Sequence, residues 1–349
     1  MRILISNDSP TAHYYIRMGI ARAFTAAGHE AVMWDINQKP VYDAFDEFNP
    51  DIFIGQTYNI NEPIIKCIEE RPHLKVIMKA GDWGPFGDRL DREKFPLHIA
   101  TEKELLMTKE LASRTGKPDY LYIHYHPDAL EQTHGHWIDN GFSVCSQLNA
   151  ADVFEFTNGQ KIEEFRSDIA FVGGYWGYKS QVLDKFLLPL CENLGDYNIK
   201  IFGNQQWPVP QYCGFIDGKM VNDVLASAAI CPNLSEPHSQ EFGFDIVERP
   251  FKLLSNKCFV ISDYVEKMEK VFGDSIVYAK TPEEFKEKVD YYLNNPEERQ
   301  KCIQSGYEKV INEHTYFDRV NEILLRLNMK DEADKILQAK GVVIGRLSV

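Results

Sequence analysis

Short blocks of apolar residues recur along the first part of the chain and alternate with amphipathic segments. Apolar runs of the kind that form buried strands occupy residues 2–6, 29–35, 50–56 and 75–81. Residues 12–28 have helical periodicity and end at Gly28, a common helix stop. Strands that alternate with helices indicate βαβ units and a parallel sheet.

The same alternation starts again near residue 167. Strand-like runs follow at residues 168–174, 198–203, 229–235, 258–262 and 275–279. The chain then becomes helical, and Thr281 and Asn295 each precede a proline and two acidic residues, as helix N-caps do. We therefore predict two successive doubly wound α/β halves, with a seam near residues 155–167.

Composition agrees with this architecture and narrows the function. A length of 349 residues fits two domains. With 52 acidic and 38 basic residues, the net charge is −14, which argues against a general nucleic-acid or anionic-membrane surface. The seven cysteines are dispersed without a C-x-x-C pair, which indicates reduced thiols. Because no apolar run approaches the roughly 20 residues that cross a bilayer, we expect a cytoplasmic protein without a membrane span.

Ligands of parallel sheets bind beyond the carboxyl ends of the strands, where Gly173 and Gly174 follow a predicted strand. A helix begins about five residues later. Glycines let backbone N–H groups approach a phosphate, the helix start adds partial positive charge, and Lys179 is placed to reach the same phosphate. A tight strand-to-helix turn without a ligand would give the same pattern. The motif is not G-x-G-x-x-G, so it does not predict a dehydrogenase-type dinucleotide site.

Charged residues gather between residues 241 and 252, just before the apolar run that starts at Cys258. We expect Glu241 to lie in a loop and the segment from Glu248 to Lys252 to begin a helix. Arg249 could then bind a diphosphate with its planar guanidinium, while a carboxylate accepts hydrogen bonds from sugar hydroxyls. A solvated helix start, where acids are favourable, is the alternative interpretation.

A series of motifs in the second half resembles a known family. The motifs include FVGGYWGYK, RPFKLLSNKCFVISD, NNPEER, SGYEKV and EHTYFDR. Together they are similar to the C-terminal domain of GT-B glycosyltransferases, and closest to the CgeB-like, spore-protein glycosyltransferase-like family. The resemblance covers about residues 165–325. The N-terminal half fits only in the order of its strands and helices.

This resemblance implies an α/β fold of GT-B type, with two doubly wound Rossmann-like domains facing across a cleft. Residues 1–160 would form the acceptor-side domain, residues 165–325 the nucleotide-sugar-binding domain, and residues 326–349 a helical tail on the N-terminal domain. The implied activity is glycosyl transfer from a nucleoside-diphosphate sugar, UDP-sugar favoured, to a hydroxyl acceptor. The donor is a substrate, and the resemblance implies neither a cofactor nor a metal.

The family's donor-binding positions map onto this chain one at a time. Gly173, Gly174 and Lys179 match the phosphate-facing loop. Gly214 and Phe215 match positions near the base pocket.

The donor-sugar loop matches less completely. Glu241 with Gly243 resembles the start of that loop, and Arg249 matches an arginine of the family. Where the family has a glutamate that binds ribose hydroxyls, this chain has Lys252. Either Glu248 takes the ribose role from a shifted position, or Lys252 makes a different contact.

An inverting transfer needs a base that deprotonates the acceptor hydroxyl. His13 is the first candidate, because it stands at the start of the first helix beside the functional edge of the predicted sheet. Asp82 is the second candidate and Asp8 the third. A retaining transfer can proceed without such a base, and then Lys179 and Arg249 would act by stabilising the leaving group.

The histidines at positions 124, 126, 134 and 136 form two His-x-His pairs. In an extended segment, residues two apart share a face, so a metal pair is conceivable. No cysteine accompanies them at zinc spacing, so we predict no metal site.

Other functions share parts of this pattern. Residues 71–117 carry ten basic and seven acidic residues, which could line a surface for DNA as an acceptor of phage type. A helix surface of mixed charge explains the same stretch. Because Lys252 replaces the family's glutamate, a protein that binds a nucleotide sugar but no longer catalyses its transfer is a further alternative. A sugar-nucleotide 2-epimerase is disfavoured because its family motifs are missing.

Overall fold

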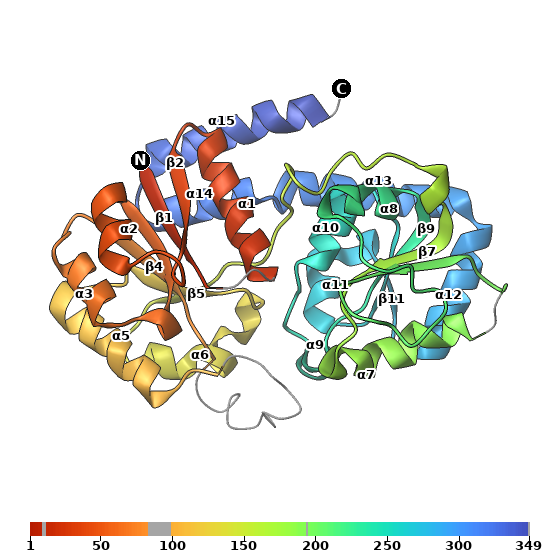
Figure 1. The fold of residues 1–349 in the computed structure, drawn as a ribbon, viewed down its shortest axis with the longest axis horizontal. Helices are drawn as coiled ribbons and strands as arrows, with labels where there is room; N and C mark the ends of the chain where they lie inside the picture. Colours follow the sequence, from red (N-terminus) through yellow and green to blue (C-terminus); the bar gives the residue numbers. More distant parts are fainter. Residues whose placement is uncertain (9–11, 83–98, 193–194, 348–349) are drawn as a thin grey trace. The chain divides into compact units, whose positions relative to one another are not determined.

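The chain divides into two compact units (Figure 1). The structure is a computed structural model that describes residues 1–8, 12–82, 99–192 and 195–347. Unit 1 comprises residues 1–148 and 316–349, and unit 2 comprises residues 149–315. The predicted boundaries were residues 160 and 325, so the chain returns to unit 1 one helix earlier than expected.

Unit 1 contains a six-stranded parallel sheet in the order β2-β1-β3-β4-β5-β6. The strands are β1 (Arg2–Asn7), β2 (Glu30–Asp35), β3 (Ile52–Gln56), β4 (Lys75–Lys79), β5 (Tyr120–Ile123) and β6 (Val144–Ser146). The order reverses at β1, which is the mark of a doubly wound sheet. The first four strands confirm the predicted runs, whereas β5 and β6 were not predicted.

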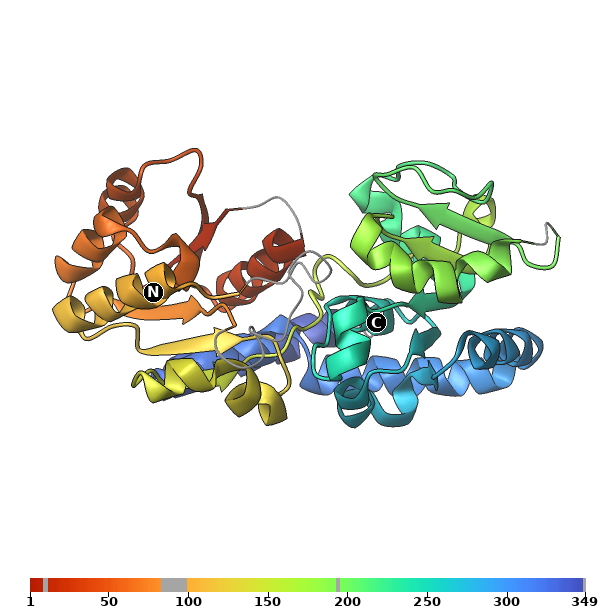
Figure 2. The same cartoon turned by 90° about the horizontal axis from the view of Figure 1, so that it is seen from below.

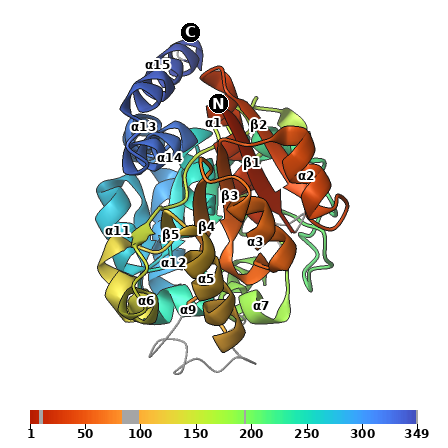
Figure 3. The same ribbon diagram turned by 90° about the vertical axis from the view of Figure 1, so that its left-hand side faces the viewer.

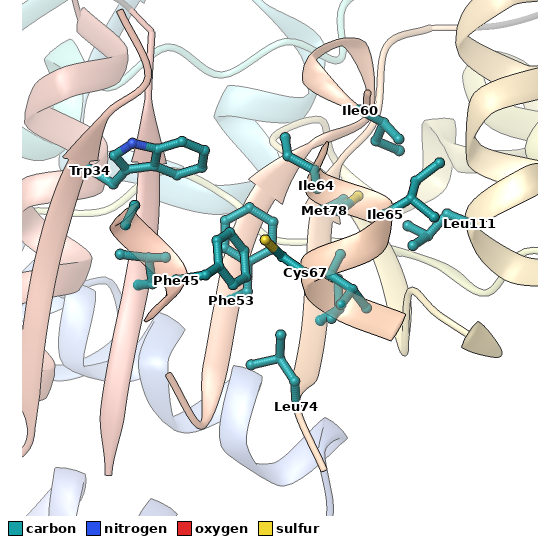
Figure 4. Packing of buried hydrophobic residues seen from close by; sticks show 14 of the residues in the cluster. Trp34, Phe45, Phe53, Ile60, Ile64, Ile65, Cys67, Leu74, Met78 and Leu111 are labelled. Atoms are coloured by element: carbon teal, nitrogen blue, oxygen red, sulfur yellow. The ribbon is translucent and has the colours of Figure 1, made fainter. Parts of the chain in front are cut away.

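Helices cover both faces of this sheet (Figure 3). They are α1 (Ala12–Ala26), α2 (Val41–Phe48), α3 (Glu62–Glu69), α5 (Glu102–Thr115), α6 (Leu130–Asp139), α14 (Tyr316–Arg326) and α15 (Lys330–Leu347). Helices α2, α3 and α5 share a core with the sheet, built around Trp34, Phe45, Phe53 and Leu111 (Figure 4). Helices α14 and α15 pack beside α1.

Unit 2 contains a five-stranded parallel sheet in the order β11-β10-β9-β7-β8. The strands are β7 (Ser167–Val172), β8 (Ile199–Phe202), β9 (Ala228–Asn233), β10 (Val260–Asp263) and β11 (Val277–Ala279). All five confirm the predicted runs. Both units are therefore doubly wound α/β structures, as predicted.

Alternate residues of β7 point to opposite faces of the unit 2 sheet, as a strand requires. Ile169 and Phe171 belong to a core with α7 and α12, whereas Ala170 packs with Val224 of α8. Helices lie on both sides of this sheet (Figures 1 and 2). They are α7 (Gly177–Phe186), α8 (Val221–Ala226), α9 (Pro237–Phe242), α10 (Arg249–Ser255), α11 (Glu266–Phe272), α12 (Pro282–Asn294) and α13 (Pro296–Glu313).

The two predicted N-caps turn out differently. Thr281 caps α12, because its Oγ1 accepts a hydrogen bond from the Glu284 backbone N–H at 3.2 Å. Asn295 precedes α13 but does not cap it with its side chain. Its Nδ2 instead donates to the Tyr291 carbonyl oxygen at 2.7 Å, at the end of the previous helix. Among the helices that the structure describes, none is both long and apolar enough to cross a membrane.

Candidate functional site

Three glycines lie next to one another at the carboxyl edge of the unit 2 sheet, where β7 and β8 end. The Gly173 backbone N–H donates to Phe202 O at 2.8 Å, and the Gly203 backbone N–H donates to Gly214 O at 3.1 Å. A Cβ atom added to Gly203 would collide with the Gly173 carbonyl oxygen. Trp207 Nε1 also donates to that oxygen, at 3.2 Å. The turn after β7 can therefore approach the end of β8 this closely because residue 203 is glycine.

Arg249 lies directly against this glycine turn. Its Nη1 donates to Val172 O at 2.7 Å, and its guanidinium carbon lies 4.5 Å from the centre of the Phe171 ring. A Cβ atom on Gly173 would come within 2.8 Å of Arg249 Nη2. Burial lowers the pKa of Arg249 to about 10. Within the described part of the chain, no carboxylate lies within 4 Å of this guanidinium.

Lys179 adds a second cation in the first turn of α7. Burial, together with the charge of Arg249, lowers the pKa of Lys179 to about 8. Lys179 makes no ion pair with any described residue. Two neighbouring buried cations that lack a direct ion pair form a site whose charge an anionic ligand would help to neutralise. The structure thus brings Arg249 against Gly173 and Lys179 into the electrostatic range of Arg249, and their role toward a phosphate stays a prediction.

Two acids that the sequence analysis missed face these cations. Asp263, at the end of β10, is fully buried and accepts hydrogen bonds from Gln240 Nε2 at 2.7 Å and Ser235 N at 2.9 Å. Burial raises the pKa of Asp263 and of Glu236, and the charge of Lys179 opposes the rise at Glu236. Both acids stand at or just after the end of a strand, a position that could have identified them.

A buried histidine connects the start of α7 with the start of α9. His238 Nδ1 lies 2.8 Å from the Tyr178 hydroxyl, and His238 Nε2 lies 2.7 Å from Asp245 Oδ2. The Tyr178 and His238 rings stack with an interplanar angle of 9°. This arrangement fixes the residue that precedes Lys179. The sequence analysis missed it because Tyr178 lies 60 residues from His238 along the chain.

The predicted base-pocket residues lie at the end of the row of glycines. Gly214 has a φ of +95°, which favours glycine. Phe215 follows it and is 75% exposed, an unusual position for a large apolar ring. Because the Gly203 N–H donates to Gly214 O, the backbone of Phe215 follows directly on the row of glycines.

The prediction that Glu241 lies in a loop is wrong. Glu241 lies in α9 and is exposed, and Gly243 ends that helix with a φ of +74°. Helix α9 starts directly after Glu236, so the acid that faces the cations precedes the helix and Glu241 lies in its last turn.

Glu248 and Lys252 bind each other. Glu248 directly precedes α10, as expected, and is buried. Lys252 Nζ lies 2.6 Å from Glu248 Oε2 and 4.3 Å from the centre of the Phe156 ring. The lysine at the family's glutamate position is thus held by the carboxylate proposed to replace that glutamate.

The candidate bases lie in unit 1 and differ in accessibility. Asp82 is 1% exposed, accepts a hydrogen bond from the Tyr125 hydroxyl at 3.0 Å and lies 3.4 Å from His134 Nε2. A carboxylate this deeply buried cannot be reached by an acceptor hydroxyl. His13 lies in the first turn of α1 and is half-buried, and the side chain of Asp8 is 21% exposed.

The histidine pairs do not share the geometry considered in the sequence analysis. His134 and His136 lie in α6, not in an extended segment, and residues two apart in a helix point in different directions. His124 is buried, with Nδ1 2.8 Å from Gln147 O. Across the described ranges, no group of three or more His, Cys, Asp or Glu residues could hold a metal ion.

Comparisons with solved structures show what this fold is similar to. A sucrose-phosphate synthase from Thermosynechococcus elongatus superimposes with a TM-score of 0.62 at 9% identity, over 93% of this chain and 98% of that one. HepE from Anabaena in complex with UDP gives a TM-score of 0.58 at 10% identity, over 94% and 100%. An alpha-glucosyltransferase in complex with UDP and a 13-mer DNA containing an HMU base gives 0.61 at 10% identity, over 94% and 99%.

At these identities the likeness concerns the fold, which is of GT-B type. No curated protein sequence matches the chain. A family model described as glycosyl transferase-like matches residues 181–325. That segment includes Arg249 and both missed acids, and it begins just after Lys179. Unit 2 thus carries a glycosyl transferase-like domain within a chain of GT-B fold.

Proposed function

We propose that this chain is a glycosyltransferase that moves a sugar from a nucleoside-diphosphate sugar, with UDP-sugar favoured, to a hydroxyl acceptor. The observation that carries the proposal is the cation pair, Lys179 and Arg249, with Arg249 against a glycine turn and neither cation in a direct ion pair with a described carboxylate. The glycosyl transferase-like match over unit 2 supports it. UDP in two of the similar structures favours UDP as the nucleotide. The motifs further favour the CgeB-like family.

In this proposal the diphosphate lies against Gly173 and Gly174. Arg249 and Lys179 stabilise the negative charge that grows on the departing nucleoside diphosphate. Phe215 offers an exposed ring on which the base can stack. Glu236 is placed to accept hydrogen bonds from the donor sugar's hydroxyls, the role that the family resemblance had suggested for Glu241. The donor is consumed as a substrate, and we propose no separate cofactor.

The acceptor hydroxyl would be deprotonated from unit 1 if the transfer inverts configuration. His13 remains the first candidate, because it lies one helical turn before Arg17 and so faces the side of α1 that contacts Asp8. Asp8 is a stronger alternative than Asp82, since Asp82 is closed off inside unit 1. A retaining transfer would depend on Lys179 and Arg249 instead.

Thermal unfolding with nucleotides tests the donor site. UDP at 100 times its dissociation constant should stabilise the chain by about 2.7 kcal/mol. Arg249→Ala should remove this stabilisation, because Arg249 supplies one of the two cations. Arg166→Ala is the matched control, since the Arg166 side chain is 76% exposed in the same unit. Stabilisation by no nucleoside diphosphate, or equal stabilisation of both variants, would count against the proposal.

DNA as the acceptor has one observation in its favour, the similar structure that contains DNA. The basic stretch that suggested a DNA surface gives less support. Arg71 pairs with Asp46 at 2.5 Å, and Arg114 pairs with carboxylates of α3 and α5. Residues 83–98 of that stretch lie outside the described part of the chain. Both of these arginines are thus neutralised, as on an ordinary surface of mixed charge.

A binding relic without turnover is distinguished from an enzyme by donor hydrolysis. A transferase releases some sugar to water when no acceptor is present, and a relic releases none. Slow release of free glucose from UDP-glucose, lost in Arg249→Ala and kept in Arg166→Ala, would support catalysis. Binding of UDP-glucose without any release would favour the relic.

A further inference from the structure

A cavity of about 1100 Å³ lies in unit 2 at the edge of the sheet opposite the glycine turn. Strands β7, β8 and β9 run parallel, so their amino ends share one edge. The first residues of β7 and β9, Ser167 and Ala228, line the cavity together with the last residues of α8 and α12, Ala226 and Asn294. We call it the amino-edge cavity. Its volume suits a small molecule, and none of the proposed donor contacts lines it.

The charged residues that line the amino-edge cavity are mostly basic. Four of them are cations and two are acids, so the cavity has an excess of two positive charges in a chain whose net charge is −14. An excess of positive charge around one hollow attracts an anion. The cations are Lys161, Arg166, Lys200 and Arg299, and the acids are Glu163 and Asp168.

Three of these four cations make no direct ion pair with any described residue. Arg166 is the exception, since it pairs with Glu163 at 3.5 Å on the surface. Lys161 makes neither a hydrogen bond nor an ion pair with the described residues. Lys200 Nζ donates to the Glu164 carbonyl oxygen. That partner is neutral, so it holds the ammonium group without cancelling its charge.

Arg299 has donors left for a ligand. Its Nη1 donates to Leu293 O at 3.1 Å and to the Tyr292 carbonyl oxygen, in the last turn of α12. A guanidinium has five N–H groups, so Nε and Nη2 keep three, and neither nitrogen is a buried atom. Burial lowers the pKa of Arg299, and the charge of Asp168 opposes this. A phosphate group can accept two parallel hydrogen bonds from such a fork.

The helix ends at this cavity explain only part of the positive charge. Helices α8 and α12 both end there, and a cation near a helix end stabilises the last carbonyl groups. Arg299 does this for α12. Lys161 and Lys200 donate to no carbonyl of either helix. Their charges are therefore left for a ligand.

We propose that the amino-edge cavity binds a small, hydroxylated phosphate monoester of the sugar phosphate class. The phosphate would contact Lys200 and Arg299, and its dianion matches the excess of two positive charges. The volume leaves room for the rest of the molecule, whose hydroxyls can donate to the Asp168 carboxylate. A nucleic acid would instead need cations along an extended surface. Because these residues do not belong to the donor site, the inference does not rest on the proposed function.

Calorimetry of the full chain with monophosphates of glucose, mannose and fructose tests the inference. At least one ester should bind, more tightly than inorganic phosphate, whereas unphosphorylated glucose should not bind. Lys161→Gln with Lys200→Gln should weaken ester binding at least about tenfold, because two charges are removed. Neither lysine is buried, so thermal unfolding without ligand should match the parent. Arg299→Lys, which loses the fork but keeps the charge, should weaken binding as well. Lys301→Gln is the matched control, because this lysine of α13 is 72% exposed and does not line the cavity.

Excess UDP should leave ester binding unchanged, because the two sites lie at opposite edges of the sheet. Displacement of the ester by UDP would assign it to the donor site and overturn the inference. Equal ester affinity in the double lysine variant and the parent overturns it as well. Equal affinity for inorganic phosphate and the esters would assign the cavity to the free ion instead. If UDP binds and no ester does, the inference fails and the donor site stands. If an ester binds through the lysines and UDP does not bind, the proposed function fails and the amino-edge site stands.

Discussion

At the scale of single residues, Lys179 makes the proposed donor site sensitive to pH. Burial and the charge of Arg249 lower the pKa of Lys179 to about 8. A diphosphate binds the protonated amine and raises that pKa, so UDP affinity should be greatest below about pH 8. Above that value it should fall by up to about tenfold per pH unit. Calorimetry between about pH 7 and about pH 10 measures this slope.

Lys179→Arg is the control for this prediction up to about pH 9, because a guanidinium stays mostly charged there even with the pKa of about 10 that burial gives Arg249. Its UDP affinity should be nearly independent of pH, and an equal slope in both proteins would assign the titration to another group. In the absence of UDP, the stability of the folded chain changes with pH in the opposite direction, and increases as the pH rises. The folded-state pKa of Lys179 lies below the ordinary value of 10.5, so deprotonation above about pH 8 adds stability to the fold.

The sequence identified Gly173, Lys179 and Arg249 as chemical types that suit a phosphate, but only the fold shows that they meet. Residues 173 and 249 are distant along the chain and come together because β7 ends, and α10 begins, at the same edge of the sheet. Glu248 and Lys252 show the limit of such reasoning. A charged pair four residues apart in a helix is equally suited to bind a ligand or each other, and the structure shows the second.

At the scale of elements, the close approach of β7 and β8 depends on Gly203. A methyl group there would collide with the Gly173 carbonyl oxygen, which belongs to the proposed phosphate turn. Gly203→Ala should therefore destabilise the chain by about 1–3 kcal/mol and weaken UDP binding, because the turn must shift. Chemical denaturation and UDP titration measure the two effects.

Gly177→Ala is the matched control for that prediction. Gly177 begins α7, and a Cβ atom added there meets nothing within 4 Å. Alanine is the better helix former, so this change should be neutral or stabilise by up to about 1 kcal/mol. UDP affinity should stay the same. Equal stability and equal UDP affinity in Gly203→Ala and Gly177→Ala would show that close packing of the turn does not require glycine at position 203.

Strands and helices could be predicted where burial gives them a clear run of apolar residues, and were missed where that run is short. Strands β1, β3 and β7 are buried and apolar, and their runs stand out in the sequence. Strands β5 and β6 have four and three residues, so their periodicity is too brief to recognise. Asn295 has the sequence of a cap, yet its side chain bonds to the preceding helix.

At the scale of the whole molecule, unit 1 depends on the end of the chain. Right-handed crossovers place α2, α3 and α5 on one face of its sheet, so α1 alone of the early described helices covers the other. Helices α14 and α15 complete that face beside α1. Gly19 allows this packing, because a Cβ atom there would collide with the Tyr316 ring. The sequence showed a helical end but not the boundary at residue 316, since the pattern of α14 does not reveal its partner.

The two units should therefore differ when they are produced alone. Residues 149–315 are one continuous segment that contains its own sheet, its own core and every proposed diphosphate contact. This fragment should unfold cooperatively and bind UDP within about tenfold of the full chain, because Lys179 and Arg249 remain in place. Residues 1–148 lack α14 and α15, and should expose the apolar side of α1 and melt without a cooperative transition. Calorimetry and UDP titration of both fragments measure this. A 149–315 fragment that folds cooperatively but fails to bind UDP would show that donor binding needs residues of unit 1, and the cation pair beside the glycine turn would then not be sufficient for the diphosphate.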